Sequence, residues 1–358
     1  MTATTLKQPL NSPPTKLASV LAWLRWPLAL SIVAYMFSAH RDGIDRIAQR
    51  DILWSWVAAA IGFRFLALML GCLRWWLLVR AQDIPVSLRD ATRMGALGNL
   101  FNLIVPGTVG GDLTKAVLIA REQPHAKTIV TATVILDRVL GLLCLLILGF
   151  GASLVDSSLW LRAELAPALL LLAGGTVAGG IGLGLVLHPA VIRLSGIQAC
   201  TRLPKVGGIV TQLLRAVELY QARKLVFVPT VLLCLIVHAS NVATYFCCAT
   251  ALMLTADAPN FSTHLVIVPV AEVAASVLPL PGGIGAREGA LQMLYVATGS
   301  SLNLTSAKQA GFYTAVGYSL VSVVVALLGG LLASALKRRE RPVLAERETR
   351  LTPATAGA

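Results

Sequence analysis

A short motif, Pro-Gly-x-(Val/Ile)-Gly, occurs twice in the chain, at residues 106–110 and 281–285. Each copy lies between an apolar segment and a segment with helical character, so a helix is expected to stop and restart there. Irregular backbone at membrane depth must be buried in protein or line a polar cavity. Interrupted apolar segments in corresponding halves of a chain point to the binding site of a transporter. The motif therefore predicts ligand binding.

The ligand that suits such breaks is an anion. A helix that restarts after a break presents free N–H groups and the positive end of its dipole. Two such N-termini brought together from opposite sides would suit phosphate. Asp112 and Glu288 could instead cap their own helices, and Asn99 and Asn102 are more simply explained by satisfying opened backbone groups. The candidate binding residues at the breaks are Asn99, Asn102, Pro106, Gly107, Gly110, Asp112, Pro281, Gly282, Gly283, Gly285, Arg287 and Glu288.

Two ionisable residues flank the second break. Glu272 lies nine residues before Pro281 and Arg287 six residues after it, so the two arms of a hairpin could place them side by side. Charges inside apolar segments are costly and usually functional. The pair could be structural, or Arg287 could bind a lipid phosphate while Glu272 holds it in place.

A second group of charges lies in the first half of the chain. Asp137 and Arg138 are sequence neighbours, so they point about 100° apart on a helix and need separate partners. Arg64 and Arg74 are the expected partners for Asp137, chiefly as a tie between helices. Arg138 joins the candidate binding residues, and Arg64, Arg74, Asp137, Glu272 and His238 are candidate supporting residues.

A polar stripe is formed by His238, Asn241 and Tyr245, which recur at helical spacing. It could line a cavity, although hydrogen bonding between helices is the simpler explanation. A single histidine does not indicate a metal, and the Cys247-Cys248 pair has no second pair with zinc spacing. Nucleotide-binding, zinc-protease and serine-hydrolase motifs are absent from the sequence. We therefore expect no cofactor, no metal and no enzymatic activity.

Membrane helices are the elements that would position these residues. The chain has 358 residues, 56% hydrophobic and 13% charged, which indicates a polytopic membrane protein. The net charge of +13 fits membrane topology and anionic headgroups, with no nucleic-acid partner expected. Six apolar stretches reach the roughly 20 residues needed to cross a bilayer. They are Leu17–Ser38, Ile52–Val79, Thr128–Leu154, Ala166–Leu187, Leu225–Met253 and Ala307–Leu336.

The segments around the two breaks are too short on each side to cross, so they are expected to be re-entrant hairpins. The predicted fold is an all-α polytopic membrane protein with six full transmembrane helices and two opposed re-entrant hairpins in an inverted repeat. The repeats would cover about 17–155 and 164–336, with an amphipathic cytoplasmic helix at about 208–224. The charged or polar ends, 1–16 and 337–358, are expected to be disordered.

The residues at the breaks resemble a known family, the flippase-like membrane proteins similar to the transmembrane region of lysylphosphatidylglycerol synthetase. The resemblance covers roughly Val20–Leu336 and is most specific at residues 279–289. Residues 74–76, 98–112 and 137–142 also carry it, with Asp137 where a Glu would be expected.

The resemblance implies translocation of an anionic phospholipid or a polyprenyl-phosphate-linked glycolipid between leaflets of a bacterial inner membrane. Lys and Arg gather on the segments that would be cytoplasmic if both termini were inside. The synthetase's aminoacyl-transfer domain has no expected counterpart here, so aminoacylation is not carried over. Two alternatives stay open: a secondary transporter of a small anion or ion, and a non-transporting partner of a lipid-modifying enzyme.

Overall fold

The computed structural model describes residues 51–104, 111, 115–118, 127–188, 190, 201, 207–252, 258–277, 285–299 and 303–336. In these residues the only regular secondary structure is helical, as predicted. The long helices are α3 (Trp54–Arg80), α6 (Lys127–Val155), α7 (Ala166–Leu187), α11 (Phe227–Ala251) and α14 (Leu304–Ala335). The shorter helices are α4 (Leu88–Ile104), α10 (Gly207–Ala222), α12 (Phe261–Val277) and α13 (Ala286–Ala297). Short 3-10 helices cover Ser157–Leu161, Ala163–Leu165 and Lys224–Val226.

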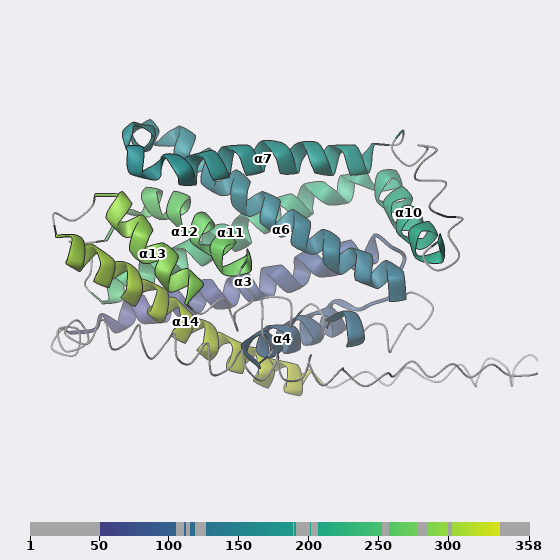
Figure 1. Ribbon diagram of the computed structural model, residues 1–358. Helices are drawn as coiled ribbons and strands as arrows, with labels where there is room; N and C mark the ends of the chain where they lie inside the picture. The colour runs from purple at the N-terminus through teal and green to yellow at the C-terminus, as the bar shows by residue number, and fades with distance from the viewer. Residues whose placement is uncertain are drawn as a thin grey trace, which may run out of the picture.

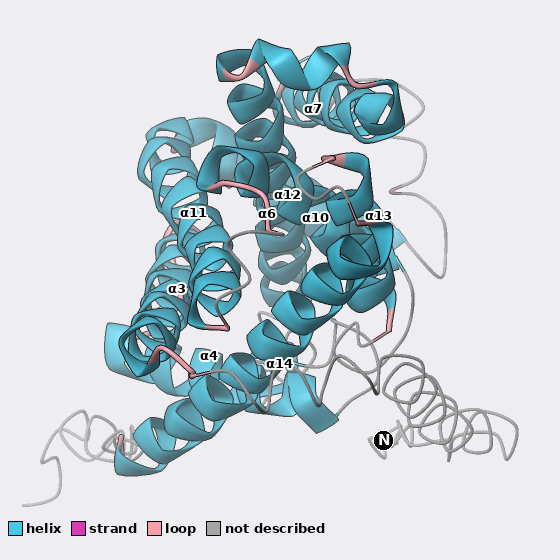
Figure 2. Cartoon of the chain, turned by 90° about the vertical axis from the view of Figure 1, so that its left-hand side faces the viewer, coloured by secondary structure: helices cyan, strands magenta, loops and turns pink. Residues whose placement is uncertain are grey.

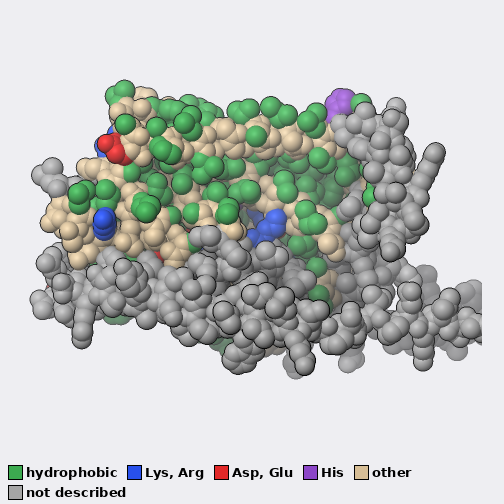
Figure 3. All heavy atoms as spheres, in the orientation of Figure 1, with side chains coloured by type: hydrophobic (Ala, Val, Ile, Leu, Met, Phe, Trp, Pro, Cys, Tyr) green, Lys and Arg blue, Asp and Glu red, His purple; other side chains and the backbone are tan. Residues whose placement is uncertain are grey.

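Among the described residues, five helical segments are long and apolar enough to cross a membrane. They contain α3, α6, α7, α11 and α14, and the helix ends agree with the predicted spans to within three residues. The sixth predicted span, Leu17–Ser38, lies outside the described residues. Apolar side chains cover much of the face shown in Figure 3. Leu170, Val177 and Ile181 of α7 are each more than half exposed, as expected for a helix that faces lipid.

The long helices lie side by side along one axis of the bundle (Figure 1). The N–H of Leu53 donates to the carbonyl of Ala251 at 3.0 Å, so the start of α3 meets the end of α11 and the two helices are antiparallel. Figure 2 looks along the bundle, with α3 and α11 on one side and α13 and α14 on the other. In Figure 1, α4 lies just to the right of the middle of the bundle, while α12 and α13 lie toward the left-hand end.

Helices α12 and α13 form an antiparallel pair around the second break. Glu272 contacts Arg287 close to the break, and His264 contacts Tyr295 further from it. At 1.5 Å per residue these helices are about 25 and 18 Å long, shorter than a hydrocarbon core of about 30 Å. A re-entrant hairpin requires this geometry. The tip, residues 278–284, lies outside the described residues, so the re-entrant hairpins and the inverted repeat stay predictions.

Close packing of α14 against α13 brings the polar residues of the two helices together. A Cβ atom at Gly311 would lie 2.6 Å from the carbonyl oxygen of Leu291, so only glycine permits this approach. Helix α12 packs against α13 and is itself enclosed, with Val266, Ile267 and Ala271 fully buried. The side chains of α12, α13 and α14 therefore converge in the interior of the bundle.

A helix occupies 207–222, where the sequence predicts an amphipathic one. This helix, α10, and the residue after it form hydrogen bonds with the end of α3 and the turn that follows it. The buried Tyr220 hydroxyl donates to the carbonyl of Leu78 at 3.0 Å, and burial raises the pKa of Tyr220, which keeps this donor protonated. Arg223 forms two hydrogen bonds, of 2.8 and 2.9 Å, with the carboxylate of Asp83. The cytoplasmic location of α10 stays a prediction.

Candidate functional site

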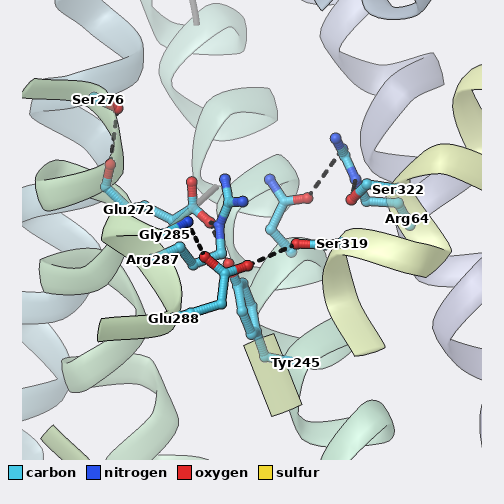
Figure 4. A network of polar contacts seen from close by, with 10 residues as sticks. Arg64, Tyr245, Glu272, Ser276, Gly285, Arg287, Glu288, Ser319 and Ser322 are labelled. Atoms are coloured by element: carbon cyan, nitrogen blue, oxygen red, sulfur yellow. Dashed lines mark hydrogen bonds and ion pairs between the residues drawn. The ribbon is translucent and has the colours of Figure 1, made fainter. Parts of the chain in front are cut away.

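A polar network lies where five helices, α3, α11, α12, α13 and α14, meet (Figure 4). It joins charged, aromatic and hydroxyl side chains that are far apart in the sequence. Its labelled members are Arg64, Tyr245, Glu272, Ser276, Gly285, Arg287, Glu288, Ser319 and Ser322.

The Glu272–Arg287 pair is present, as the sequence predicts. Arg287 Nε lies 2.9 Å from Glu272 Oε1, with side chains 8% and 22% exposed respectively. The hydroxyl of Tyr245 also donates to Glu272 Oε1. This carboxylate therefore ties α11, α12 and α13 together, which supports a structural role for the pair.

Tyr318, which was not predicted from the sequence, provides an aromatic surface in the network. Its ring stacks on Tyr245, with centroids 3.9 Å apart and planes inclined by 6°. The guanidinium carbons of Arg287 and Arg64 lie 5.1 and 5.5 Å from its centroid. Both distances are in the range of cation–π attraction. Two arginines from different helices thus approach one buried ring.

Arg64 makes hydrogen bonds only with neutral groups among the described residues. It donates from Nε to Ser322 Oγ at 3.1 Å and from Nη1 to Asn241 Oδ1 at 3.3 Å. The sequence left Arg64 and Arg74 as alternative partners for Asp137, and the structure assigns Asp137 to Arg74.

Glu288 caps its own helix, which is one of the two roles expected for it. Its Oε2 accepts from the N–H of Gly285 at 2.5 Å, and its Oε1 accepts from Ser319 Oγ at 3.2 Å. Gly285 has a φ of 91°, a conformation that side chains disfavour, so the glycine is needed at this turn. An anion that accepts from the N–H of Gly285 would have to displace Glu288.

Asn102 satisfies opened backbone at the first break, as expected. Its Oδ1 accepts from the N–H of Gly111 at 2.6 Å. A Cβ atom at Gly98 would lie 2.7 Å from the carbonyl oxygen of Gly111, so the chain passes very close to α4 here. Asn99 Nδ2 is buried and has no hydrogen-bond partner among the described residues. The remaining predicted residues of the breaks lie outside the described part of the chain: Pro106, Gly107, Gly110, Asp112, Pro281, Gly282 and Gly283.

The second ion pair lies away from this network. Arg74 Nη2 donates to Asp137 Oδ2 at 3.0 Å, and its Nε approaches Oδ1 at 2.9 Å as a charge contact without hydrogen-bond alignment. Arg74 Nη1 also lies 2.7 Å from Cys234 Sγ on α11. Arg138 is exposed on the other side of α6, beside the exposed Ile135 and Leu142. The neighbours Asp137 and Arg138 thus face apart, as predicted.

The structure therefore groups the predicted residues into two clusters. Arg64, Glu272, Gly285, Arg287 and Glu288 belong to the network of Figure 4, while Arg74 and Asp137 form the second pair. The neutral residues on α14 were missed. The available signal was the recurrence of Tyr318, Ser319 and Ser322 along one helical turn of an apolar span.

Comparison with known proteins gives one family. The chain matches the family described as the lysylphosphatidylglycerol synthase TM region over residues 20–330. Neither the curated proteins nor the solved structures gave a match. The matched range includes both breaks, both ion pairs and the network of Figure 4. With five apolar helices long enough to cross a membrane, the chain belongs to the multi-pass membrane family of the lysylphosphatidylglycerol synthase transmembrane region.

Proposed function

We propose that this protein moves a lipid with an anionic headgroup between the two leaflets of a membrane. The observation that carries the proposal is the approach of Arg64 and Arg287 to the ring of Tyr318, inside a bundle of membrane helices. Arginine is well suited to phosphate, because its planar guanidinium can donate two parallel hydrogen bonds. The substrate class is an anionic phospholipid or a polyprenyl-phosphate-linked glycolipid, and the family's name supports a phospholipid.

The headgroup would enter the polar interior while the acyl chains stay in the lipid. The first break would approach from one side of the membrane, and α12 and α13 from the other. In Figure 1, α12 and α13 lie to the left of the middle of the bundle and α4 to the right of it, which supports this arrangement. The mobile element at the second break would be the side chain of Glu288, which accepts from the N–H of Gly285, the residue before α13.

The cellular setting follows from the same proposal. The protein would lie in a bacterial cytoplasmic membrane, with both termini and α10 on the cytoplasmic side. It would act as a translocase without covalent chemistry of its own, and a lipid-modifying enzyme could be its partner.

The test is reconstitution of the purified protein into phosphatidylcholine vesicles that contain fluorescent phosphatidylglycerol. A membrane-impermeant reductant bleaches headgroups on the outer leaflet, and translocation makes the inner ones accessible over time. We expect bleaching beyond that in protein-free vesicles. Bleaching equal to that of protein-free vesicles would refute lipid movement. Uptake of inorganic phosphate by the same vesicles would then favour a small-anion transporter.

A further inference from the structure

Arg64, Arg74 and Arg287 point into the bundle. Of these three, only Arg74 and Arg287 form ion pairs with a carboxylate among the described residues. Arg74 pairs with Asp137 and Arg287 pairs with Glu272. Arg64 is half-buried and, among the described residues, contacts only a serine, an asparagine and a tyrosine ring. The fourth charge of the network, Glu288, is held by Gly285 and Ser319.

Arg64 is a cation inside a bundle of membrane helices, and none of the ion pairs among the described residues includes it. A cation inside a membrane bundle normally faces a carboxylate, backbone carbonyls or a water-filled cavity. The Nη2 group of Arg64 has no hydrogen-bond partner among the described residues, and Nη1 uses one of its donors on Asn241. These donors are the ones a phosphate oxygen would accept from.

One face of α11 joins the three arginines. Cys234, His238, Asn241 and Tyr245 are spaced by four, three and four residues, so they lie along a single side of the helix. Cys234 contacts Arg74, Asn241 contacts Arg64, and Tyr245 contacts Glu272, the partner of Arg287. The stripe is about 16 Å long, roughly half the hydrocarbon core.

His238 lies in the middle of this stripe, between the contacts of Arg74 and Arg64. Its Nε2 is buried and has no hydrogen-bond partner among the described residues. The other face of α11 is apolar and exposed, with Val228, Leu232 and Ile236 each about half exposed or more. The polar stripe is therefore the interior side of α11.

We propose that Arg64 is the mid-membrane phosphate-binding residue, and that the Cys234–Tyr245 stripe of α11 is the path that the phosphate follows between Arg74 and Arg287. This inference rests on the proposed function and assigns the ligand's position within it. The ligand chemistry is a phosphate group, which a lipid headgroup or free phosphate could supply. The two ion-paired arginines would bind it in exchange for their carboxylates, and Arg64 would bind it without such an exchange.

The binding test uses thermal unfolding of the detergent-purified protein with two probes, dihexanoyl-phosphatidylglycerol and inorganic phosphate. We expect the short-chain lipid to stabilise the wild type, and Arg64→Gln to weaken its binding about tenfold or more, since one charge-assisted hydrogen bond is lost. Arg64→Lys keeps the charge and should retain most of the binding. The matched control is Lys308→Gln, which removes a cation from an exposed position on α14 and should bind normally.

The outcomes separate the inference from the proposed function. Equal binding by Arg64→Gln and the wild type would overturn the role of Arg64, even if lipid movement is observed. Binding of inorganic phosphate but not of the lipid, lost in Arg64→Gln, would support Arg64 and refute a lipid substrate. Failure of the wild type to bind either probe would overturn the site.

The path is tested separately with His238→Leu in the vesicle assay. This variant leaves Arg64 intact, so binding of the short-chain lipid should persist. It removes the polar group in the middle of the stripe, so translocation should slow. Translocation at the wild-type rate in His238→Leu would overturn the path along α11.

Discussion

The Glu272–Arg287 ion pair allows a quantitative prediction. Glu272→Gln leaves Arg287, whose side chain is 8% exposed, without its carboxylate. Removing one partner of a buried ion pair costs about 3–5 kcal/mol, because the remaining charge stays desolvated. Glu272 is 22% exposed, so water can reach part of the site. We therefore expect a loss near the lower limit, about 3 kcal/mol in the free energy of unfolding.

Exchanging the two residues, as Glu272→Arg with Arg287→Glu, should recover most of this loss. The ion pair is restored, and the Tyr245 hydroxyl can accept from an arginine as well as donate to a carboxylate. The cation over Tyr318, now 5.1 Å from the ring centroid, is removed from its position. That contact is worth about 0.5–2 kcal/mol, so the exchanged variant should stay about 1 kcal/mol less stable than the wild type.

Equilibrium unfolding of the purified protein, followed by tryptophan fluorescence, would measure these differences. A Glu272→Gln variant within about 0.5 kcal/mol of the wild type would refute the reasoning, as would an exchanged variant no more stable than Glu272→Gln. Lipid movement provides a second measurement. Recovery of stability without recovery of translocation would show that the ligand needs the guanidinium at position 287.

Three further predictions concern glycines and topology. Gly285→Leu should abolish translocation in the vesicle assay, because Gly285 has a φ of 91°, where a side chain costs about 1–3 kcal/mol and would distort the turn that positions Arg287 and Glu288. Gly184→Leu is the control, since nothing lies within 4 Å of a Cβ atom at that position. Equal translocation rates of the two variants would contradict a role for the turn at Gly285. Gly311→Ala should lower the free energy of unfolding by about 1–3 kcal/mol, because its Cβ would lie 2.6 Å from the Leu291 carbonyl. Gly62→Ala should leave the free energy of unfolding unchanged, because its Cβ atom has no neighbour within 4 Å. Similar free energies of unfolding for the two variants would refute the close-contact argument. Single cysteines at Ser158 and Ser262 should react with a membrane-impermeant maleimide from outside intact cells, and one at Glu218 on α10 should not; outside labelling at Glu218 would reverse the orientation.

The spans and one ion pair could be predicted from the sequence for simple physical reasons. A run of about 20 apolar residues is a strong signal, because a bilayer allows few other structures. Glu272 and Arg287 could be paired because they lie on the two sides of one break, and a short turn leaves few ways to arrange its arms. The ends of the spans and the pairing of residues on the two sides of one break depend on nearby sequence alone.

Contacts between distant helices could not be predicted in the same way. The sequence left Arg64 and Arg74 as equal partners for Asp137, since it does not determine how far each helix slides along its neighbours. Tyr318 was missed because an aromatic residue in an apolar span is ordinarily a packing residue. Its role follows only from the close approach of α14 to α13, which depends on the bare α-carbon of Gly311.

The contacts that join α3 to α11 at both ends limit how these two helices can move relative to each other. The Leu53–Ala251 backbone hydrogen bond joins the two helices at one end, and the Asp83–Arg223 ion pair joins their connections at the other. The predicted repeats assign α3 to the first half of the chain and α11 to the second. Helices that are joined at both ends are expected to move together, so we do not expect the two predicted halves to rock as separate bodies. Any interface along which helices slide must then lie elsewhere. The ring of Tyr318 lies in the interface of α3 and α11 with α12, α13 and α14.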